Sequence, residues 1–480
     1  MINLVLALFS GVVGGLIVAA MPGVKNRIRN LVVLLFSISG MVFSWRVALL
    51  VFAGKSVRIA GEFAGFSWSL GPDPLGAVFG LIVSSLWLFA SIYSFGYMEG
   101  KHKQHTYYTF LLLAFSVTLG VAFSGNLVAL YLFYELLTFV TYPLVIYEGS
   151  PEAMKAGTKY ILYSLSGAGA ILIAMVITYS WAGSLDFADN AILAGFKGSG
   201  LNWLLALFII GFGVKAAIMP LHRWLPGAMV APTPVSALLH AVAVVYSGAY
   251  GIVRVVYSVF GYQLVGQLSF GRIMPWLIGF TILAAVIIAV RQDVLKRRLA
   301  YQTISHLSYI LLGVFTLQPW GLAGAIMHMI SYSTLKVSLF FCAGIISEQT
   351  GQTKISKMGG IGWLQPKTMV AFSIATLGMI GMLPLNTFWG KYYLMKGSVE
   401  GGQWPLAVAL IISGIINAVC FIPVIVNAFR GERADRNAEK ETRVAFMLIP
   451  TLTLSMFSLL VGLWPGLVWP GVQAVVNWFF

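Results

Sequence analysis

Long apolar runs separated by short polar connections follow one another along the whole chain. Most runs are close to the roughly twenty residues that a helix needs to cross the hydrocarbon core of a bilayer. Fourteen such segments can be marked, at residues 2–21, 31–52, 75–98, 107–123, 126–147, 157–182, 202–221, 231–258, 273–290, 299–317, 321–347, 367–397, 404–429 and 444–464. We therefore predict an all-α polytopic membrane protein with about fourteen transmembrane helices.

Two connections are longer than the others. Residues 55–72 alternate small, polar and apolar residues and contain Gly61 and Gly65, which indicates a hairpin outside the membrane. Residues 183–200 form a second polar connection. The tail 465–480 is apolar with two Trp-Pro pairs, so we expect it at the membrane interface. The pattern leaves no room for a separate soluble domain.

Composition and charge agree with this prediction. Charged residues make up 9% of the chain, whereas an average soluble protein has about 25%. The net charge of +15 would indicate a nucleic-acid partner in a soluble protein, but here its distribution explains it. Of the 30 Lys and Arg residues, twenty fall in every second loop, beginning with the loop 22–30; this set includes Arg433, Arg436, Lys440 and Arg443. The loops on the opposite side contain only four, namely Lys55, Arg58, Lys197 and Arg272. By the positive-inside rule, the first set is cytoplasmic and both termini face the outside of the cell membrane.

No cofactor is expected in this chain. Cys342 and Cys420 both lie in apolar runs, where cysteine usually serves as a small core residue. The sequence has no CxxC pair, no glycine-rich nucleotide loop and no HExxH zinc motif. It therefore carries no sign of a redox centre, a metal site or a hydrolytic site.

A few charged residues fall inside the apolar runs. Glu135 is the one acidic residue in the middle of a run, and Lys215, Lys336, Lys391 and Lys396 also lie within spans. A charge at mid-bilayer costs at least about 2.5–3.5 kcal/mol, which makes each of these residues a functional hypothesis. Glu135 and Lys215 could form a static ion pair that only holds helices together. Alternatively, a buried lysine next to a mobile carboxylate can take up and release a proton, which is the basis of a proton relay.

Histidines add to this set. His240 and His328 lie in apolar surroundings and fit a relay, because histidine titrates near neutral pH. His222 and His306 are equally compatible with a relay and with an ordinary hydrogen-bonded core. The arginines Arg46 and Arg254 lie near span ends, and we expect their side chains to reach out to the membrane interface.

Two spans contain a proline next to a lysine. Pro220 follows Lys215 and Pro384 precedes Lys391, and both prolines begin similar patterns, PLHRW and PLNTFW. Proline interrupts a helix, and such a break is tolerated at membrane depth only inside protein or beside water. The breaks are five spans apart, which places them in opposite orientations and indicates inverted repeats, although two ordinary proline kinks would also explain them.

We place the repeats at spans 4–8 and 9–13. The single transmembrane domain 1–480 then divides into 1–106 with spans 1–3, 107–258 as the first inverted repeat, 273–429 as the second, and 444–480 as the last span and tail.

Four segments resemble a known family. They are KAAIMPLHRWLPGAMVAPTPVSALLHA at 215–241, DVLKRRLAYQTISHLSYILLG at 293–313, HMISYSTLKVSLFFCAG at 328–344, and the span of Glu135, LYLFYELLTFVTYPLV. They resemble the antiporter-like, proton-translocating membrane subunits shared by respiratory complex I, Mrp cation/proton antiporters (the D-type subunit) and membrane-bound hydrogenases. The resemblance covers essentially the whole fourteen-span core.

The resemblance implies two inverted five-helix repeats, broken helices 7 and 12, and a charged, hydrated axis along the membrane midplane. The residues that match the family's charged relay positions are Glu135, Lys215, Lys336 and Lys391. His240 and His328 fall on histidines that are found in some members. Family members carry no redox centre. The implied partners are other membrane subunits of the same complex, both antiporter-like and small multi-helix ones, and hydrophilic redox subunits in some assemblies.

Two positions depart from the family pattern. Tyr246 stands where many members have a lysine, and Tyr332 stands where some have a second histidine. A tyrosine hydroxyl can pass a proton along a hydrogen-bond chain but does not supply a cation. We therefore expect the link between the two halves to depend on His240, Tyr246 and water.

The leading interpretation is an ion-translocating subunit of a multi-subunit complex, in which protons enter near spans 7–8, pass Lys215 and Lys336, and leave by Lys391. A stand-alone solute or cation symporter with a substrate site at the breaks is one alternative, and a structural subunit without transport is another. The sequence leaves open which complex the subunit joins and whether sodium takes part.

Overall fold

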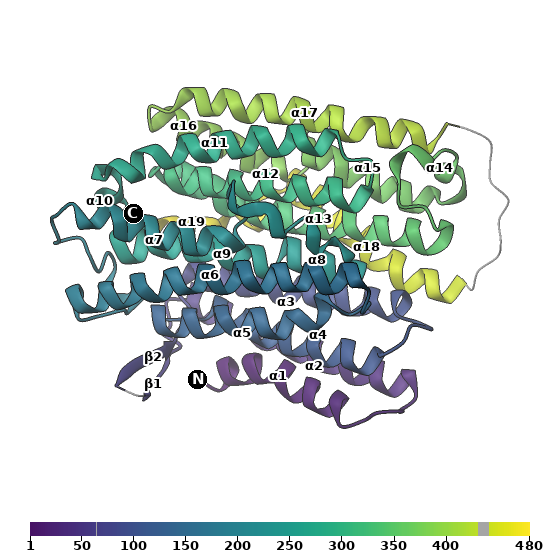
Figure 1. The fold of residues 1–480 in the computed structure, drawn as a ribbon, viewed down its shortest axis with the longest axis horizontal. Helices are drawn as coiled ribbons and strands as arrows, with labels where there is room; N and C mark the ends of the chain where they lie inside the picture. The colour runs from purple at the N-terminus through teal and green to yellow at the C-terminus, as the bar shows by residue number, and fades with distance from the viewer. Residues whose placement is uncertain (64, 431–440) are drawn as a thin grey trace.

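The computed structural model describes residues 1–63, 65–430 and 441–480, apart from the side chains of 63, 66 and 441–443. Arg433, Arg436 and Lys440, which contributed to the predicted loop charge, lie outside the described residues, as does the side chain of Arg443. The remaining chain is almost entirely helical, and its helices lie side by side with roughly parallel axes (Figure 1).

The first part of the bundle is made of α1 (Ile2–Ala19), α2 (Asn26–Phe52), α3 (Pro74–Tyr97), α4 (Gln104–Ala122), α5 (Leu127–Val145) and α6 (Pro151–Ala182). Between α2 and α3, strands β1 (Ile59–Phe63) and β2 (Phe66–Leu70) pair antiparallel, which confirms the predicted hairpin. The turn η1 (Phe187–Asp189) lies in the connection after α6.

The middle of the chain is more interrupted. It comprises α7 (Gly200–Lys215), the short turns η2 (Leu221–Trp224) and η3 (Gly227–Val230), α8 (Thr233–Ala241), α9 (Val244–Arg254), the π-helical turn η4 (Val255–Phe260) and α10 (Tyr262–Gln267).

The last part contains α11 (Ser269–Val290), α12 (Leu295–Phe315), α13 (Pro319–Thr350), η5 (Ile355–Lys357), α14 (Ile361–Leu364), α15 (Pro366–Ile380), α16 (Thr387–Glu400), α17 (Trp404–Ala428), α18 (Glu441–Leu463), η6 (Pro465–Leu467) and α19 (Trp469–Phe479). The predicted apolar tail therefore forms a helix, with Val472 and Val475 buried.

The predicted fold class is confirmed. Within the described residues, 11 helices are long and apolar enough to cross a membrane, counting α8 to η4 as one, and α7 and α15 are shorter apolar helices. The more polar α12 occupies the predicted tenth span, and α15 with α16 occupies the twelfth. Each of the fourteen predicted segments therefore coincides with one helix or with one interrupted helix.

Loops predicted to share a side of the membrane meet in the structure. At one end of the bundle, Leu70 pairs with Ser124 and Asn126 pairs with Asp186, which joins the connections after α2, α4 and α6. At the other end, Val294 pairs with Lys354, which joins the connections after α11 and α13. The hairpin and α10 lie at the left of Figure 1, and α14 lies at the right. We call these the hairpin end and the α14 end.

The centre of the bundle is formed by α8, α9 and α13. The span from Thr233 to Phe260 is buried along its whole length, whereas α1, α2, α6 and α17 expose many large apolar side chains. An apolar outer surface is what a bilayer requires, so the charged residues inside spans must face the centre.

Three spans are interrupted near this centre. Two interruptions are the predicted ones, at Pro220 and Pro384. The peptide bond that precedes each of these prolines is cis. The third is between α8 and α9, where Val242 and Ala243 leave helical geometry. The sequence predicts a continuous span there, because residues 231–258 offer no proline or glycine at that point.

The predicted position of the Arg254 side chain at the membrane interface is wrong. Its side chain does not reach the membrane interface but is fully buried, and it forms a bidentate ion pair with Asp73 at the start of α3. The pair ties α9 to α3 near the hairpin end. Arg46, in contrast, is exposed.

Close backbone contact between α13 and α16 generates a testable prediction. A Cβ atom on Gly324 would lie 2.9 Å from the carbonyl carbon of Tyr393 and 3.0 Å from Cα of Leu394. Because these neighbours are backbone atoms, Gly324→Val should force the helices apart and cost about 1–3 kcal/mol of stability. Thermal unfolding of the purified protein in detergent measures the effect.

Gly169→Val on α6 is the matched control, since a Cβ atom there meets nothing within 4 Å. Equal melting temperatures for the two variants would contradict the proposed close contact.

Candidate functional site

Lys215 is the last residue of α7 and is completely buried. Its Nζ atom donates a hydrogen bond to the backbone carbonyl of Tyr134 in α5 and lies 3.5 Å from the centre of the Tyr134 ring. The ammonium group is thus held by a carbonyl dipole and an aromatic face rather than by a carboxylate.

Glu135 follows Tyr134 on the same helix. It is partly buried, and its Oε1 atom has no hydrogen-bond partner among the described residues. The carboxylate interacts electrostatically with Lys215, but the ion pairs of the described chain do not include these two residues. A static Glu135–Lys215 bridge, the simpler of the two sequence interpretations, is therefore not formed.

Lys336 lies in the middle of α13 and is also fully buried. Its Nζ atom donates to the carbonyl of Leu299 in α12 at 2.5 Å and lies 5.6 Å from the ring centres of Tyr332 and Phe340. His240 lies beside the same Phe340 ring, with the two ring centres 5.5 Å apart. Both ring nitrogens of His240 lack a partner within the described residues.

Tyr246 lies on α9, just beyond the interruption that follows His240. Its hydroxyl donates to the carbonyl of Met329 in α13 at 3.1 Å, so it joins the two central spans. The hydroxyl of Tyr332, one turn further along α13, has no partner in the described part of the chain.

A pair of histidines lies between Lys336 and Lys391. Nδ1 of His306 is 3.1 Å from Nε2 of His328, and the two rings stack with centres 5.3 Å apart. His306 also stacks on Tyr332 at 4.8 Å and contacts Asn417 through Nε2 at 3.4 Å. The sequence is equally compatible with a relay and a core role for His306, and the structure places it in direct contact with His328.

Lys391 lies in α16, after the second break. Its Nζ atom donates to the carbonyls of Met379 and Ile380 at 2.9 and 2.7 Å and lies 5.4 Å from the Tyr309 ring. These carbonyls belong to the last turn of α15, where a helix end leaves acceptors without intrahelical donors. The break at Pro384 therefore provides the acceptors that hold the lysine.

The break at Pro220 works differently. Trp224 donates its indole N–H to the carbonyl of Val214 at 2.7 Å, so a residue of the PLHRW pattern satisfies the end of α7. The tryptophan of the second pattern, Trp389, instead donates to Gly462 of α18. The two similar sequences thus break both helices but make different contacts.

The contacts place most of the predicted residues in one row. We define the buried row as the ten residues Glu135, Lys215, His240, Tyr246, Lys336, Tyr332, His306, His328, Tyr309 and Lys391. From His240 through Phe340 to Lys336, and on to Lys391, each neighbour is in ring, hydrogen-bond or cation–π contact. Glu135, Lys215 and Tyr246 lie apart from this run, although Tyr246 reaches the backbone of α13 at Met329.

Several polar atoms of the buried row have no protein partner. Within the described chain these include atoms of Glu135, His240, His328, Tyr309 and Tyr332. The side chains of Gln302 and Ser413 also have buried polar atoms without a partner in the described chain. Buried polar atoms are nearly always satisfied in folded proteins, and water satisfies those that side chains do not.

A metal site is not visible in the part of the chain described here. Those residues contain no group of three or more His, Cys, Asp or Glu placed to hold a metal ion. Cys342 and Cys420 are both buried and free.

Comparison with known proteins gives one consistent family. The model of the family described as "NADH:quinone oxidoreductase/Mrp antiporter, TM" matches residues 124–417. The chain is 34% identical over 409 residues to NADH-quinone oxidoreductase subunit N of Desulforudis audaxviator, covering 82% of this chain and 81% of that protein. It is 26% identical over 439 residues to the D-type subunit of the Na(+)/H(+) antiporter of Bacillus subtilis, covering 90% and 88%.

Solved structures share the fold. A chain of the Mrp complex from Dietzia sp. DQ12-45-1b has a TM-score of 0.88 at 21% identity, covering 100% of this chain and 98% of that chain. A chain of respiratory complex I from Thermus thermophilus has a TM-score of 0.85 at 21% identity, covering 99% and 98%. With the sequence matches, these show that the chain belongs to the antiporter-like membrane subunit family of NADH:quinone oxidoreductases and Mrp antiporters.

Proposed function

We propose that this chain is an ion-translocating membrane subunit of a multi-subunit complex in the cell membrane and that it moves protons along the buried row. The proposal is supported by the family membership and by three lysines held inside the bundle. The path enters from the cytoplasmic side near spans 7–8, passes Lys215 and Lys336, and leaves by Lys391.

One observation carries the proposal. Lys215, Lys336 and Lys391 are all buried, and each Nζ atom bonds to backbone carbonyls without a carboxylate partner in the described chain. A buried, fully formed ion pair fixes the charge of both members, because removing one charge leaves the other unpaired. A carbonyl can accept a hydrogen bond from either the ammonium or the neutral amine, so these lysines can change charge without leaving a buried carboxylate unpaired.

Glu135 has a different part in this proposal. Its charge acts on Lys215 without a direct ion pair. A shift of the carboxylate toward or away from Lys215 therefore changes how strongly the lysine holds its proton. His240 and Tyr246 connect this first lysine to Lys336 through water, since their contacts do not reach Lys215 directly.

The symporter alternative is less well supported. It requires a substrate cavity at the breaks. Cavities of about 210 and 450 Å³ at the hairpin end are lined by neither Pro220 nor Pro384. The lysine variants described below distinguish an ion-translocating subunit from a purely structural one.

Partners follow from the same proposal. The relatives and the structural neighbours belong to multi-subunit membrane complexes. We expect other antiporter-like and small multi-helix membrane subunits beside this chain, with hydrophilic redox subunits where the complex is redox-driven.

Lysine and glutamate variants test the function. Lys215→Ala, Glu135→Ala and Lys391→Ala should each lower proton transport by at least about tenfold in proteoliposomes of the assembled complex, because each removes a charge that holds or directs the proton. Co-purification of the partner subunits confirms assembly. Transport at the normal rate in an assembled Lys215→Ala complex would exclude the proposed path.

Lys396→Ala is the matched control. Lys396 lies on the same helix as Lys391, but it is half-exposed, with Nζ 3.5 Å from the Trp320 ring and 4.0 Å from Glu400. It should transport at the normal rate. Replacing sodium with potassium in the same assay shows whether a metal cation takes the proton's place.

The histidine pair gives a second test. His306→Phe and His328→Phe keep the stacked rings but remove the nitrogens that join them, so each should slow transport by about tenfold or more. Because the histidines act as one unit, the double variant should be little worse than either single variant. His105→Phe, at the exposed start of α4, is the control. Additive losses in the double variant would show that the histidines do not act together.

The predicted orientation is tested separately. Tags at the N- and C-termini should be accessible to antibody on intact cells, because twenty loop cations gather on the opposite side. A tag inserted near Lys354 in the connection after α13 should be accessible only after the membrane is opened. The reverse pattern would reverse the direction of the proposed path.

A further inference from the structure

The larger cavity at the hairpin end, about 450 Å³, is not part of the buried row. It lies where the connections after α2, α4 and α6 meet the tail helix. The charged residues that line it are Lys55, Arg58, Asp73, Asp186 and Arg254. Arg58 and Asp186 pair with each other at its partly exposed rim.

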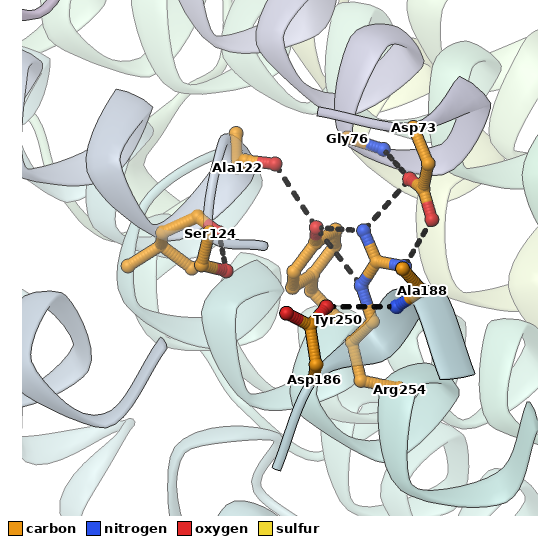
Figure 2. A network of polar contacts seen from close by, with 9 residues as sticks. Asp73, Gly76, Ala122, Ser124, Asp186, Ala188, Tyr250 and Arg254 are labelled. Atoms are coloured by element: carbon orange, nitrogen blue, oxygen red, sulfur yellow. Dashed lines mark hydrogen bonds and ion pairs between the residues drawn. The ribbon is translucent and has the colours of Figure 1, made fainter. Parts of the chain in front are cut away.

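Asp73 and Arg254 form a buried cluster with Tyr250 (Figure 2). Nη1 of Arg254 donates to Oδ2 of Asp73, and Nη2 donates to Oδ1 at 2.7 Å. Nε and Nη2 also donate to the Tyr250 hydroxyl at 3.1 and 2.6 Å, and that hydroxyl donates to the carbonyl of Ala122 at 2.9 Å. Both residues line the cavity. The Asp73 side chain is 10% exposed and the Arg254 side chain only 1%, so the guanidinium is the more deeply buried of the two.

A stripe on α9 joins this cluster to the buried row. Tyr246, Tyr250 and Arg254 are spaced by four residues, which places them on one face of the helix. Phe79 of α3 stacks on both tyrosine rings, with centres 6.3 Å from Tyr246 and 5.1 Å from Tyr250. The stripe rises about 12 Å from Tyr246 to Arg254, so it spans the distance from the bundle centre toward the hairpin end.

We propose that the cavity is the mouth of an outward-facing proton path that branches from the buried row at Tyr246, with Asp73 as its last proton acceptor and Arg254 as its gate. The proposal rests on the function proposed above. It adds a second exit, on the first half of the chain, to the exit at Lys391.

The proton balance of this path is simple. Each tyrosine hydroxyl or intervening water accepts one proton and releases one, so it ends as it began. The Asp73 carboxylate takes the proton, which removes the charge that binds Arg254 and frees the guanidinium to move. The carboxylic acid then gives the proton to water in the cavity, and the ion pair re-forms. Arg254 keeps its own proton throughout.

A static clamp between α3 and α9 is the competing explanation. A clamp needs neither a cavity beside the carboxylate nor a line of hydroxyls behind the guanidinium. Moreover, a buried ion pair is often no more stabilising than well-packed apolar side chains, so stability alone is a weak reason for one. The two explanations differ in what the loss of charge does to transport.

Transport by matched variants separates them. Asp73→Asn retains the cap on α3, since asparagine can also accept from the Gly76 amide that Asp73 binds at 2.9 Å. Asp73→Asn and Tyr250→Phe should each lower proton transport of the assembled complex in proteoliposomes by about tenfold. Lys197→Gln, in the connection after α6 at the same end, should leave transport unchanged.

A double variant without either charge is needed because a single substitution that leaves one buried charge unpaired can misfold the protein. Asp73→Asn with Arg254→Gln removes both charges together, so no unpaired buried charge remains. If this variant assembles and transports poorly, the path is supported; if it assembles and transports normally, the cluster is a clamp and the proposal is wrong.

Thiol labelling tests the cavity itself. Both natural cysteines are buried, whereas Ala188 is exposed and lines the cavity. A membrane-impermeant cationic thiosulfonate added from the hairpin side should label Ala188→Cys and block transport, whereas labelling the exposed Ala194→Cys, which lines the smaller cavity, should not. Labelling of Ala188→Cys without loss of transport would overturn the path.

The outcomes are separable from those of the proposed function. Loss of transport in Lys215→Ala together with normal transport in Asp73→Asn and Tyr250→Phe would overturn this path and leave the proposed function standing. Normal transport in Lys215→Ala would overturn the function itself, whatever the Asp73 variants do.

Discussion

A lysine ammonium group inside a bilayer must be held by something other than water, and in this chain backbone carbonyls hold it. Lys215, Lys336 and Lys391 donate to carbonyls of α5, α12 and α15 respectively. Regular helices have few spare acceptors, because each internal carbonyl already accepts from the amide four residues later. The break between α15 and α16 ends a helix next to Lys391 and so exposes acceptors that an unbroken span would not provide.

This constraint also explains the dense centre of the bundle. The carbonyl that holds each lysine is on a neighbouring element, so the lysine-bearing helix must lie very close to it. Glycines allow equally close packing between other pairs of helices in this region: a Cβ atom on Gly248 of α9 would lie 2.9 Å from the carbonyl carbon of Lys215 on α7, and one on Gly390 of α16 would lie 3.0 Å from Cα of His328 on α13. The same closeness excludes bulky side chains, so the unpartnered polar atoms of the buried row must be satisfied by water molecules in a narrow space.

Features that depend on neighbouring residues in the sequence could be predicted, whereas contacts between distant spans could not. Apolar length located all fourteen segments, and a charge inside an apolar run is visible without a structure, so Glu135 and the lysines could be found. Proline marked two of the interruptions, whereas the third, at Val242 and Ala243, has no proline or glycine to mark it and lies within a fully buried span. His306 bonds to His328 across two helices, and Arg254 pairs with Asp73 over 181 residues of sequence. Such pairings depend on which helices become neighbours, and one sequence does not show this.

The two halves of the chain are chemically unequal, and this bears on how they work together. The second half contains Lys336, the histidine pair and Lys391 in continuous contact, whereas the first contains Lys215 and Glu135 without a histidine pair. The junction is made by His240, whose nitrogens are free of protein partners in the described chain, and by Tyr246, whose hydroxyl is bound to Met329. In the path that we propose, a tyrosine at this position passes a proton but adds no cation, so it would not repel a charge arriving from Lys215 as a lysine would. On that proposal, transfer between the halves depends on hydration at the interruption between α8 and α9, because no hydrogen bond or ring contact joins Lys215 to His240 or Tyr246 in the described chain.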